Sequence, residues 1–137
     1  DRPMIWLTIT EAWCGDAAQN IPLIEKIAAG SDKIRTRYIL RDANAELMDR
    51  FLSDGNRSIP KLIVLDAIDL SVLGTWGPRP EAAQTFLAEL KAGGLDKAEM
   101  MERVQVWYNA DKGRSLFAEF TALMRELKGL RAVTAAA

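Results

Sequence analysis

The first two thirds of the chain alternate short apolar runs with longer amphipathic segments. Met4–Ile9 is an almost continuous apolar run, which predicts a strand buried on both faces. From 17 to 29 the apolar residues recur at helical spacing, with Pro22 inside the pattern, and a β-rich segment follows at 34–40. We therefore expect a strand, a helix kinked by Pro22 and a second strand.

The pattern continues with a polar helix entry at 42–44 and an apolar stripe at helical spacing that extends to Leu52. Strands are predicted at 61–65 and 70–76, and a helix at 81–90. Strand–helix–strand units imply parallel pairing, whereas the short connection between the last two strands implies an antiparallel hairpin. The pattern therefore predicts an α/β fold with a mixed sheet flanked by helices.

Two further apolar stripes at helical spacing follow Gly94, over 96–109 and 114–128. Such stripes are far more often core than cofactor-binding segments. We therefore expect residues 95–129 to be a two-helix extension packed on the domain formed by residues 1–92. Residues 130–137 carry no pattern, and we expect them to form a tail.

Composition narrows the classes of partner. The chain has 137 residues, a formal net charge of −1 and 49% hydrophobic residues, as in an ordinary single globular domain. A net charge this close to zero provides no electrostatic attraction to nucleic acid or to an anionic membrane. No apolar run approaches the roughly 20 residues of a membrane span. We expect neither partner, and leave the oligomeric state open. The lone cysteine favours a reducing, cytoplasmic compartment.

Cys14 lies between the first predicted strand and the first predicted helix, and it is the only cysteine. Backbone N–H groups and the helix dipole stabilise a thiolate at such a position. The chain contains no histidine, which excludes a Cys–His or Ser–His pair and argues against a zinc site, so we expect no bound metal. Because a lone thiol cannot form an internal disulfide, any redox chemistry requires a second molecule.

Four motifs in register resemble the thioredoxin family. Residues 13–15 read Trp-Cys-Gly, like the start of the family's Trp-Cys-Gly-Pro-Cys motif, and Pro22 occupies the place of its helix-kinking proline. Residues 42–44 resemble its Val-Asp-x-Asn segment, and residues 57–60 match its Arg-Ser-Ile-Pro segment, whose proline is cis and faces the active-site cysteine. The resemblance covers about residues 4–92 and implies a thioredoxin-like fold with a C-terminal helical extension.

The Trp-Cys-Gly-Asp form, the segment 74–80 and the helical C-terminal part resemble a bacterial branch known only as thioredoxin-like proteins. Members of that branch carry more helix before the first strand. Because this chain begins at Asp1 rather than at a methionine, we expect that it is trimmed.

Three positions depart from the family pattern. Ala17 stands where the second cysteine would fall, Asp16 where the intervening proline would fall, and Thr8 where the buried proton-accepting aspartate would fall. The family's dithiol cycle therefore cannot run here, because a mixed disulfide at Cys14 has no internal thiol to resolve it.

We expect Cys14 and Asp16 to form the catalytic site, with the inert, half-buried thiol of a dithiol ancestor as the alternative for Cys14. Three interpretations of Asp16 stay open: its charge opposes ionisation of the thiol, it shuttles a proton to a leaving thiolate, or it stabilises the helix N-terminus by about 0.3–1 kcal/mol. By resemblance, a substrate would bind over five residues: Trp13, Gly15, Ser58, Ile59 and Pro60. The cations Arg57 and Lys61 beside them are expected to be solvated.

Two functions follow from these features. The first is a monothiol thiol–disulfide exchange protein in redox homeostasis, which acts on a protein or small-molecule disulfide. It needs no resident cofactor, but glutathione or another low-molecular-weight thiol is the expected co-substrate. The alternative is a redox-inactive binding module that grips a protein partner. Iron–sulfur ligation is disfavoured, because the Cys-Gly-Phe-Ser and Thr-Val-Pro segments of monothiol glutaredoxins are absent.

Overall fold

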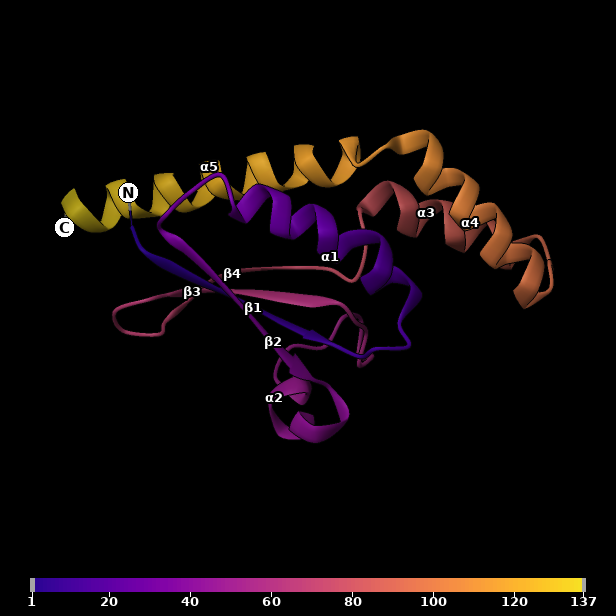
Figure 1. Cartoon of the computed structure of the whole chain (residues 1–137), viewed down its shortest axis with the longest axis horizontal. Coiled ribbons are helices and arrows are strands. Elements are labelled where there is room, and N and C mark those ends of the chain that lie inside the picture. The colour runs from indigo at the N-terminus through magenta and orange to yellow at the C-terminus, as the bar shows by residue number, and fades with distance from the viewer. Residues whose placement is uncertain (1, 137) are drawn as a thin grey trace.

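A four-stranded mixed sheet forms the centre of the computed structural model, which describes residues 2–136 and the side chains up to residue 128. The strand order is β2-β1-β3-β4 (Figure 1). β1 (Met4–Thr10) pairs in parallel with β2 (Ile34–Leu40) and antiparallel with β3 (Lys61–Asp66). β4 (Val72–Trp76) is antiparallel to β3, as the predicted hairpin requires.

The helices cover both faces of this sheet (Figure 1). α2 (Ala45–Asp49) lies on one face, after the short 3₁₀ turn η1 (Asp42–Asn44). α1 (Gly15–Ala28), α3 (Glu81–Ala92), α4 (Lys97–Asp111) and α5 (Arg114–Ala136) lie on the other side. The predicted mixed α/β fold with a C-terminal helical extension is thus confirmed.

The alternation of side chains along the strands builds two apolar clusters. Trp6 of β1 lies in a cluster with residues of α1 and α5, including Ile24 and Phe120. Ile9, three residues later, lies in a second cluster with Met48 of α2. Cys14 belongs to this second cluster, so the packing of β1, β3 and α2 holds the thiol in place.

Two predicted elements are shorter in the structure. The helix expected through Leu52 ends at Asp49. Its start is interrupted at Asn44, the last residue of η1, because the backbone there is not helical (φ −135°, ψ 47°). The strand expected from Leu70 begins at Val72, since Leu70 takes a left-handed conformation (φ 61°) in the connecting turn.

The C-terminal helices extend the structure beyond the sheet. α4 packs against α3, while α5 contacts α1 and β4 and buries Leu116 and Phe120. The Glu119 carboxylate of α5 accepts hydrogen bonds from Trp76 Nε1 and from the Glu81 backbone N–H, both at 2.8 Å, and so caps the start of α3.

The backbone of α5 continues as helix to Ala136, beyond the end of the apolar stripe at 128 and through most of the predicted tail. Ala137 and the side chains of residues 129–136 lie outside the described part, so the tail and the boundaries at 92 and 95 stay predictions. None of the helices in the described part of the chain combines the length and the hydropathy that a membrane span requires.

Candidate functional site

Cys14 is the N-terminal cap of α1. Its backbone is extended (φ −76°, ψ 118°), and its sulfur accepts a hydrogen bond from the Ala17 backbone N–H at 3.4 Å. The thiol also donates to the Ile59 carbonyl oxygen at 3.4 Å, and the residue is only 9% exposed. The sulfur therefore lies at the positive end of a helix, between an amide donor and a carbonyl acceptor.

The loop before β3, which carries Ile59, contacts the Cys14 thiol together with the N-terminus of α1. The Ile59–Pro60 peptide bond is cis, as the resemblance predicts, and both residues are buried. The loop of Pro60 lies against Cys14, as the resemblance implies, because the thiol contacts the Ile59 carbonyl oxygen. Ser58 is half-buried and lines a polar groove together with Lys61 and Trp76.

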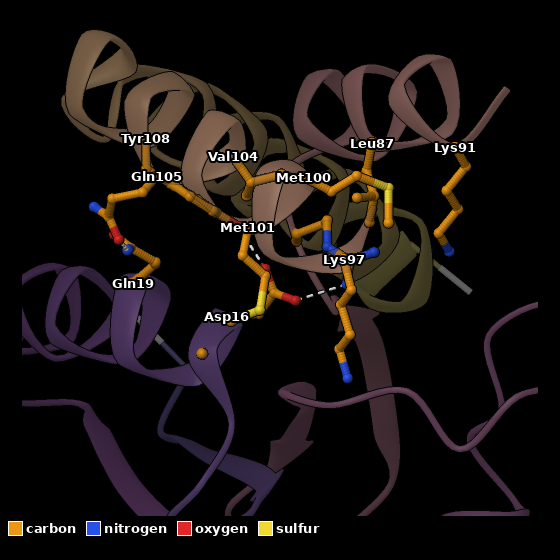
Figure 2. Close-up of a pocket in the computed structure, with 12 residues that line it drawn as sticks. Asp16, Gln19, Leu87, Lys91, Lys97, Met100, Met101, Val104, Gln105 and Tyr108 are labelled. Atoms are coloured by element: carbon orange, nitrogen blue, oxygen red, sulfur yellow. Dashed lines mark hydrogen bonds and ion pairs between the residues drawn. The ribbon is translucent and has the colours of Figure 1, made fainter. Parts of the chain in front are cut away.

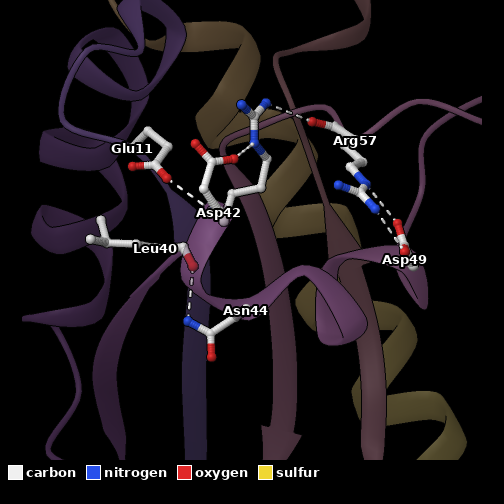
Figure 3. Close-up of polar contacts among 7 residues, drawn as sticks. Glu11, Leu40, Asp42, Asn44, Asp49 and Arg57 are labelled. Atoms are coloured by element: carbon white, nitrogen blue, oxygen red, sulfur yellow. Dashed lines mark hydrogen bonds and ion pairs between the residues drawn. The ribbon is translucent and has the colours of Figure 1, made fainter.

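Polar contacts brace the two loops that precede α1 and β3 (Figure 3). Arg41 donates to the Arg57 carbonyl oxygen at 3.2 Å, and its guanidinium lies 5.0 Å from the centre of the Trp13 ring. Arg57 in turn forms a bidentate ion pair with Asp49, in which its Nε and Nη2 lie 2.7 and 2.9 Å from the two carboxylate oxygens. Trp13 is 66% exposed, so most of its ring is open to solvent.

Asp16 is held by two groups from distant parts of the chain. Arg79, in the turn between β4 and α3, forms an ion pair with it at 2.6 Å, and the Tyr108 hydroxyl of α4 donates to it at 2.9 Å. Buried Asn20 donates to both Tyr108 Oη and the Asp16 carbonyl, at 3.2 and 2.9 Å. Whatever role Asp16 has beside the thiol, its carboxylate is already engaged by Arg79 and Tyr108.

The titration of these partners follows from their surroundings. Burial lowers the pKa of Arg79, but the hydrogen bond and charge of Asp16 outweigh burial and raise its pKa overall. Burial, together with the charge of Asp16, raises the pKa of Tyr108. Both groups therefore keep their protons through the physiological range, and Asp16 keeps both donors.

Ala17 and Thr8, two of the three positions that depart from the family pattern, are buried, whereas Asp16 is partly exposed. Ala17 fills the place of a second thiol, and its N–H faces the sulfur. Thr8 is buried, and its hydroxyl has no hydrogen-bond partner among the described residues. Gly15 begins α1, and a Cβ at this position would meet no atom within 4 Å.

Lys61 differs from its prediction. It was expected to be solvated, but it is only 8% exposed and its ammonium donates to Ser53 Oγ at 3.1 Å. Burial lowers its pKa. The expectation of exposure is wrong for Lys61, because this residue directly follows Pro60 and begins the buried strand β3.

Sequence reasoning missed Arg79 and Tyr108 as neighbours of the thiol motif. Tyr108 lies in the helix predicted over 96–109 and Arg79 in the segment 74–80, and neither assignment places the residue beside Asp16. No spacing rule connects residues 16, 79 and 108, so the only available signal was the unexplained aspartate in the motif. In the described part of the chain, no group of three or more histidine, cysteine or acidic residues is placed to hold a metal ion.

Comparisons with known proteins agree with this geometry. An HIV epitope scaffold of known structure is 26% identical, with a TM-score of 0.53 over 61% of this chain and 50% of the scaffold, so this chain spans half of the scaffold's length. A protein of unknown function from Pseudomonas aeruginosa is 24% identical, with a TM-score of 0.54 over 80% of this chain and 68% of that protein; this likeness shows the fold alone. Curated proteins gave no match. The sequence model of a family described as Thioredoxin matches residues 1–91, and the chain therefore belongs to the thioredoxin family.

Proposed function

We propose that this protein is a monothiol thiol–disulfide exchange protein in which Cys14 is the nucleophile. One observation carries the proposal. The Cys14 sulfur lies at the N-terminus of α1, within hydrogen-bond distance of the Ala17 N–H and of the Ile59 carbonyl in the loop of Pro60. This environment supports both the neutral thiol, which donates to the carbonyl, and the thiolate, which accepts from the amide.

The exchange takes place in two steps. The Cys14 thiolate attacks one sulfur of a disulfide, so a new S–S bond forms, the old S–S bond breaks, and the leaving thiolate takes a proton from water. Since Ala17 provides no second thiol, a separate thiol must attack the mixed disulfide and release Cys14. Glutathione or another small thiol of a reducing cytoplasm is the co-substrate that this scheme requires.

Asp16 supports this chemistry indirectly. Its carboxylate is paired with Arg79 and accepts from Tyr108, so its negative charge is compensated where it would otherwise oppose a thiolate two residues away. Arg79 is also close enough to interact electrostatically with Cys14 itself. Among the three interpretations, we favour a compensated first-turn carboxylate over a free proton shuttle.

Turnover of a mixed disulfide tests the proposal. A peptide–glutathione disulfide is incubated with the protein and reduced glutathione, and release of the peptide thiol is followed by chromatography. Turnover above the uncatalysed rate is expected for the unmodified chain and should disappear in Cys14→Ser. The variant Ala17→Cys, which restores a second thiol, should release bound glutathione without an added thiol. Turnover that persists in Cys14→Ser would overturn the proposal.

A binding module is the second candidate, and the contrast between Trp13 and Cys14 favours it. The ring is 66% exposed while the thiol is 9% exposed, so a partner would meet the ring before the sulfur. This function predicts that a protein partner binds equally well to the Cys14→Ser variant and loses affinity in Trp13→Ala. Affinity that depends on Cys14 would instead favour exchange.

A further inference from the structure

A cleft opens beside the thiol motif, between the start of α1 and the helices α3 and α4 (Figure 2). Its volume is about 320 Å³, which suits a small molecule or one short chain. Gly15 and Asp16, the two residues after Cys14, line its base. α4 lies outside residues 1–91, so this wall is an addition to the part that matches the family.

The walls of the cleft are apolar. Leu87 from α3 and Met100 and Val104 from α4 point into it, and each is half-buried (Figure 2). Methionine side chains are flexible and adapt to ligands of different shape. Gln19 and Gln105 meet at one end and contribute no charge there. An aliphatic or aromatic body would therefore fit between α3 and α4.

The other end of the cleft carries positive charge. Lys91 and Lys97 lie there, both exposed, and neither forms an ion pair among the described residues. Asp16 is the one acidic residue in the lining that the structure describes, and Arg79 already compensates it. The two lysine charges are thus left in excess, which complements an anion.

We propose that this cleft selects the disulfide that Cys14 attacks, and that it takes low-molecular-weight disulfides and thiols with an anionic group on an apolar chain. The inference rests on the exchange function proposed above and names its substrate class. The apolar chain lies along Leu87, Met100 and Val104, and the anionic group lies near Lys91 and Lys97. Cys14 does not itself line the cleft, so the ligand's sulfur extends past Gly15 to reach it.

The reaction with this ligand is the same thiol–disulfide exchange, in which atoms and electrons are conserved. The Cys14 thiolate attacks the sulfur that bears the bound chain, so the Cys14–ligand S–S bond forms as the ligand's own S–S bond breaks. The other half leaves as a thiolate and takes a proton from water. The Cys14 sulfur is oxidised and the leaving sulfur is reduced, so no further oxidant is needed.

The test compares two disulfides that differ only in the charged group, those of mercaptohexanoate and of aminohexanethiol. Rate constants for reaction with Cys14 are measured by mass spectrometry and divided by those for a free small thiol. The unmodified protein should prefer the anionic disulfide by about tenfold, the order expected for two neighbouring charges. Lys91→Gln with Lys97→Gln should bring the ratio close to one.

Two controls isolate the cleft. Lys26→Gln with Lys33→Gln removes the same charge from exposed positions that do not line the cleft, and should leave the preference unchanged. Val104→Trp fills the cleft, so it should slow both hexyl disulfides while sparing the shorter hydroxyethyl disulfide. Equal rates for the two charges in the unmodified protein, or an equal loss in both lysine pairs, would overturn the inference.

A separate measurement keeps this result distinct from failure of exchange itself. Calorimetry with octanoate and the Cys14→Ser variant reports on the cleft without any thiol chemistry. Binding that disappears when Lys91 and Lys97 are replaced supports the cleft even if Cys14 reacts with no disulfide. Absence of octanoate binding contradicts the assigned ligand class even if Cys14 exchanges rapidly.

Discussion

At the scale of single residues, the opposite charges of Asp16 and Arg79 together set the electrostatic potential at the Cys14 thiol. Replacing Arg79 by Gln leaves the Asp16 charge uncompensated beside Cys14, which disfavours the thiolate. We expect Arg79→Gln to slow disulfide exchange at neutral pH by about tenfold. The measurement is the rate constant with a neutral small disulfide, which carries no charge to be steered.

A matched double variant separates this charge effect from simple loss of structure. Asp16→Asn combined with Arg79→Gln removes both charges and keeps similar shapes, so it should recover most of the lost rate. If the double variant reacts as slowly as Arg79→Gln alone, the uncompensated charge of Asp16 does not explain the slower disulfide exchange.

Lys61 gives a prediction about stability and pH. Because its pKa is lowered in the folded protein, the unfolded chain binds the proton more tightly, and stability rises as pH increases from the lowered value to about 10.5. Lys61→Met removes the buried charge. It should stabilise the protein by about 1 kcal/mol at pH 7, and the gain should shrink as the pH approaches 10.5.

Urea unfolding of both proteins across this pH range provides the measurement, and Lys33→Met is the control. Lys33 is exposed, so its replacement should change stability little at any pH. A gain from Lys61→Met that does not depend on pH would contradict the buried-charge explanation.

At the scale of elements, the turn after β4 is pressed against the loop that carries Pro60. Gly77 has φ +119°, and a Cβ built there would lie 2.2 Å from the Pro60 carbonyl oxygen. Gly77→Ala should therefore both strain the backbone and displace the Pro60 loop from Cys14. We expect a loss of more than about 3 kcal/mol of stability, measured by urea unfolding.

Gly94→Ala is the control, because Gly94 also has a positive φ (+74°) but a Cβ there would meet nothing within 4 Å. It should cost only the backbone strain, about 1–2 kcal/mol. Equal losses in the two variants would mean that the contact between the turn and the loop contributes nothing.

At the scale of the whole molecule, α5 completes the core of the sheet. Phe120 is 1% exposed and packs edge to face against Trp6 and Trp76, with ring centres 5.5 and 5.1 Å away. Phe120→Ala should cost about 3–5 kcal/mol. Phe117, on the same helix, is 63% exposed, and its replacement should change stability by less than about 0.5 kcal/mol.

Thermal or urea unfolding of these two variants shows whether the C-terminal helices belong to the folding unit. A small loss from Phe120→Ala, similar to that from Phe117→Ala, would indicate that the sheet domain is stable without α5.

The sequence predicts those features that local patterns and short motifs encode, namely the mixed sheet and one contact of the thiol. Strand and helix periodicity predict the mixed sheet, and the motifs at 13–15 and 57–60 anticipate the contact between Cys14 and Ile59. It does not anticipate that Tyr108 reaches Asp16, because this contact joins residues 92 positions apart and depends on how α4 packs. The burial of Lys61 also escapes prediction, since a charged residue at a strand start normally faces solvent.

The most direct test of the central claim compares Cys14 in the folded and the urea-unfolded chain. The rate constant for reaction with a small neutral disulfide is measured in both states at the same pH, with Cys14→Ser as the blank. We predict faster reaction in the folded protein, because α1 and the Ala17 N–H stabilise the thiolate more than they hinder access. Slower reaction in the folded protein would mean that burial dominates and that Cys14 is not an active exchange thiol.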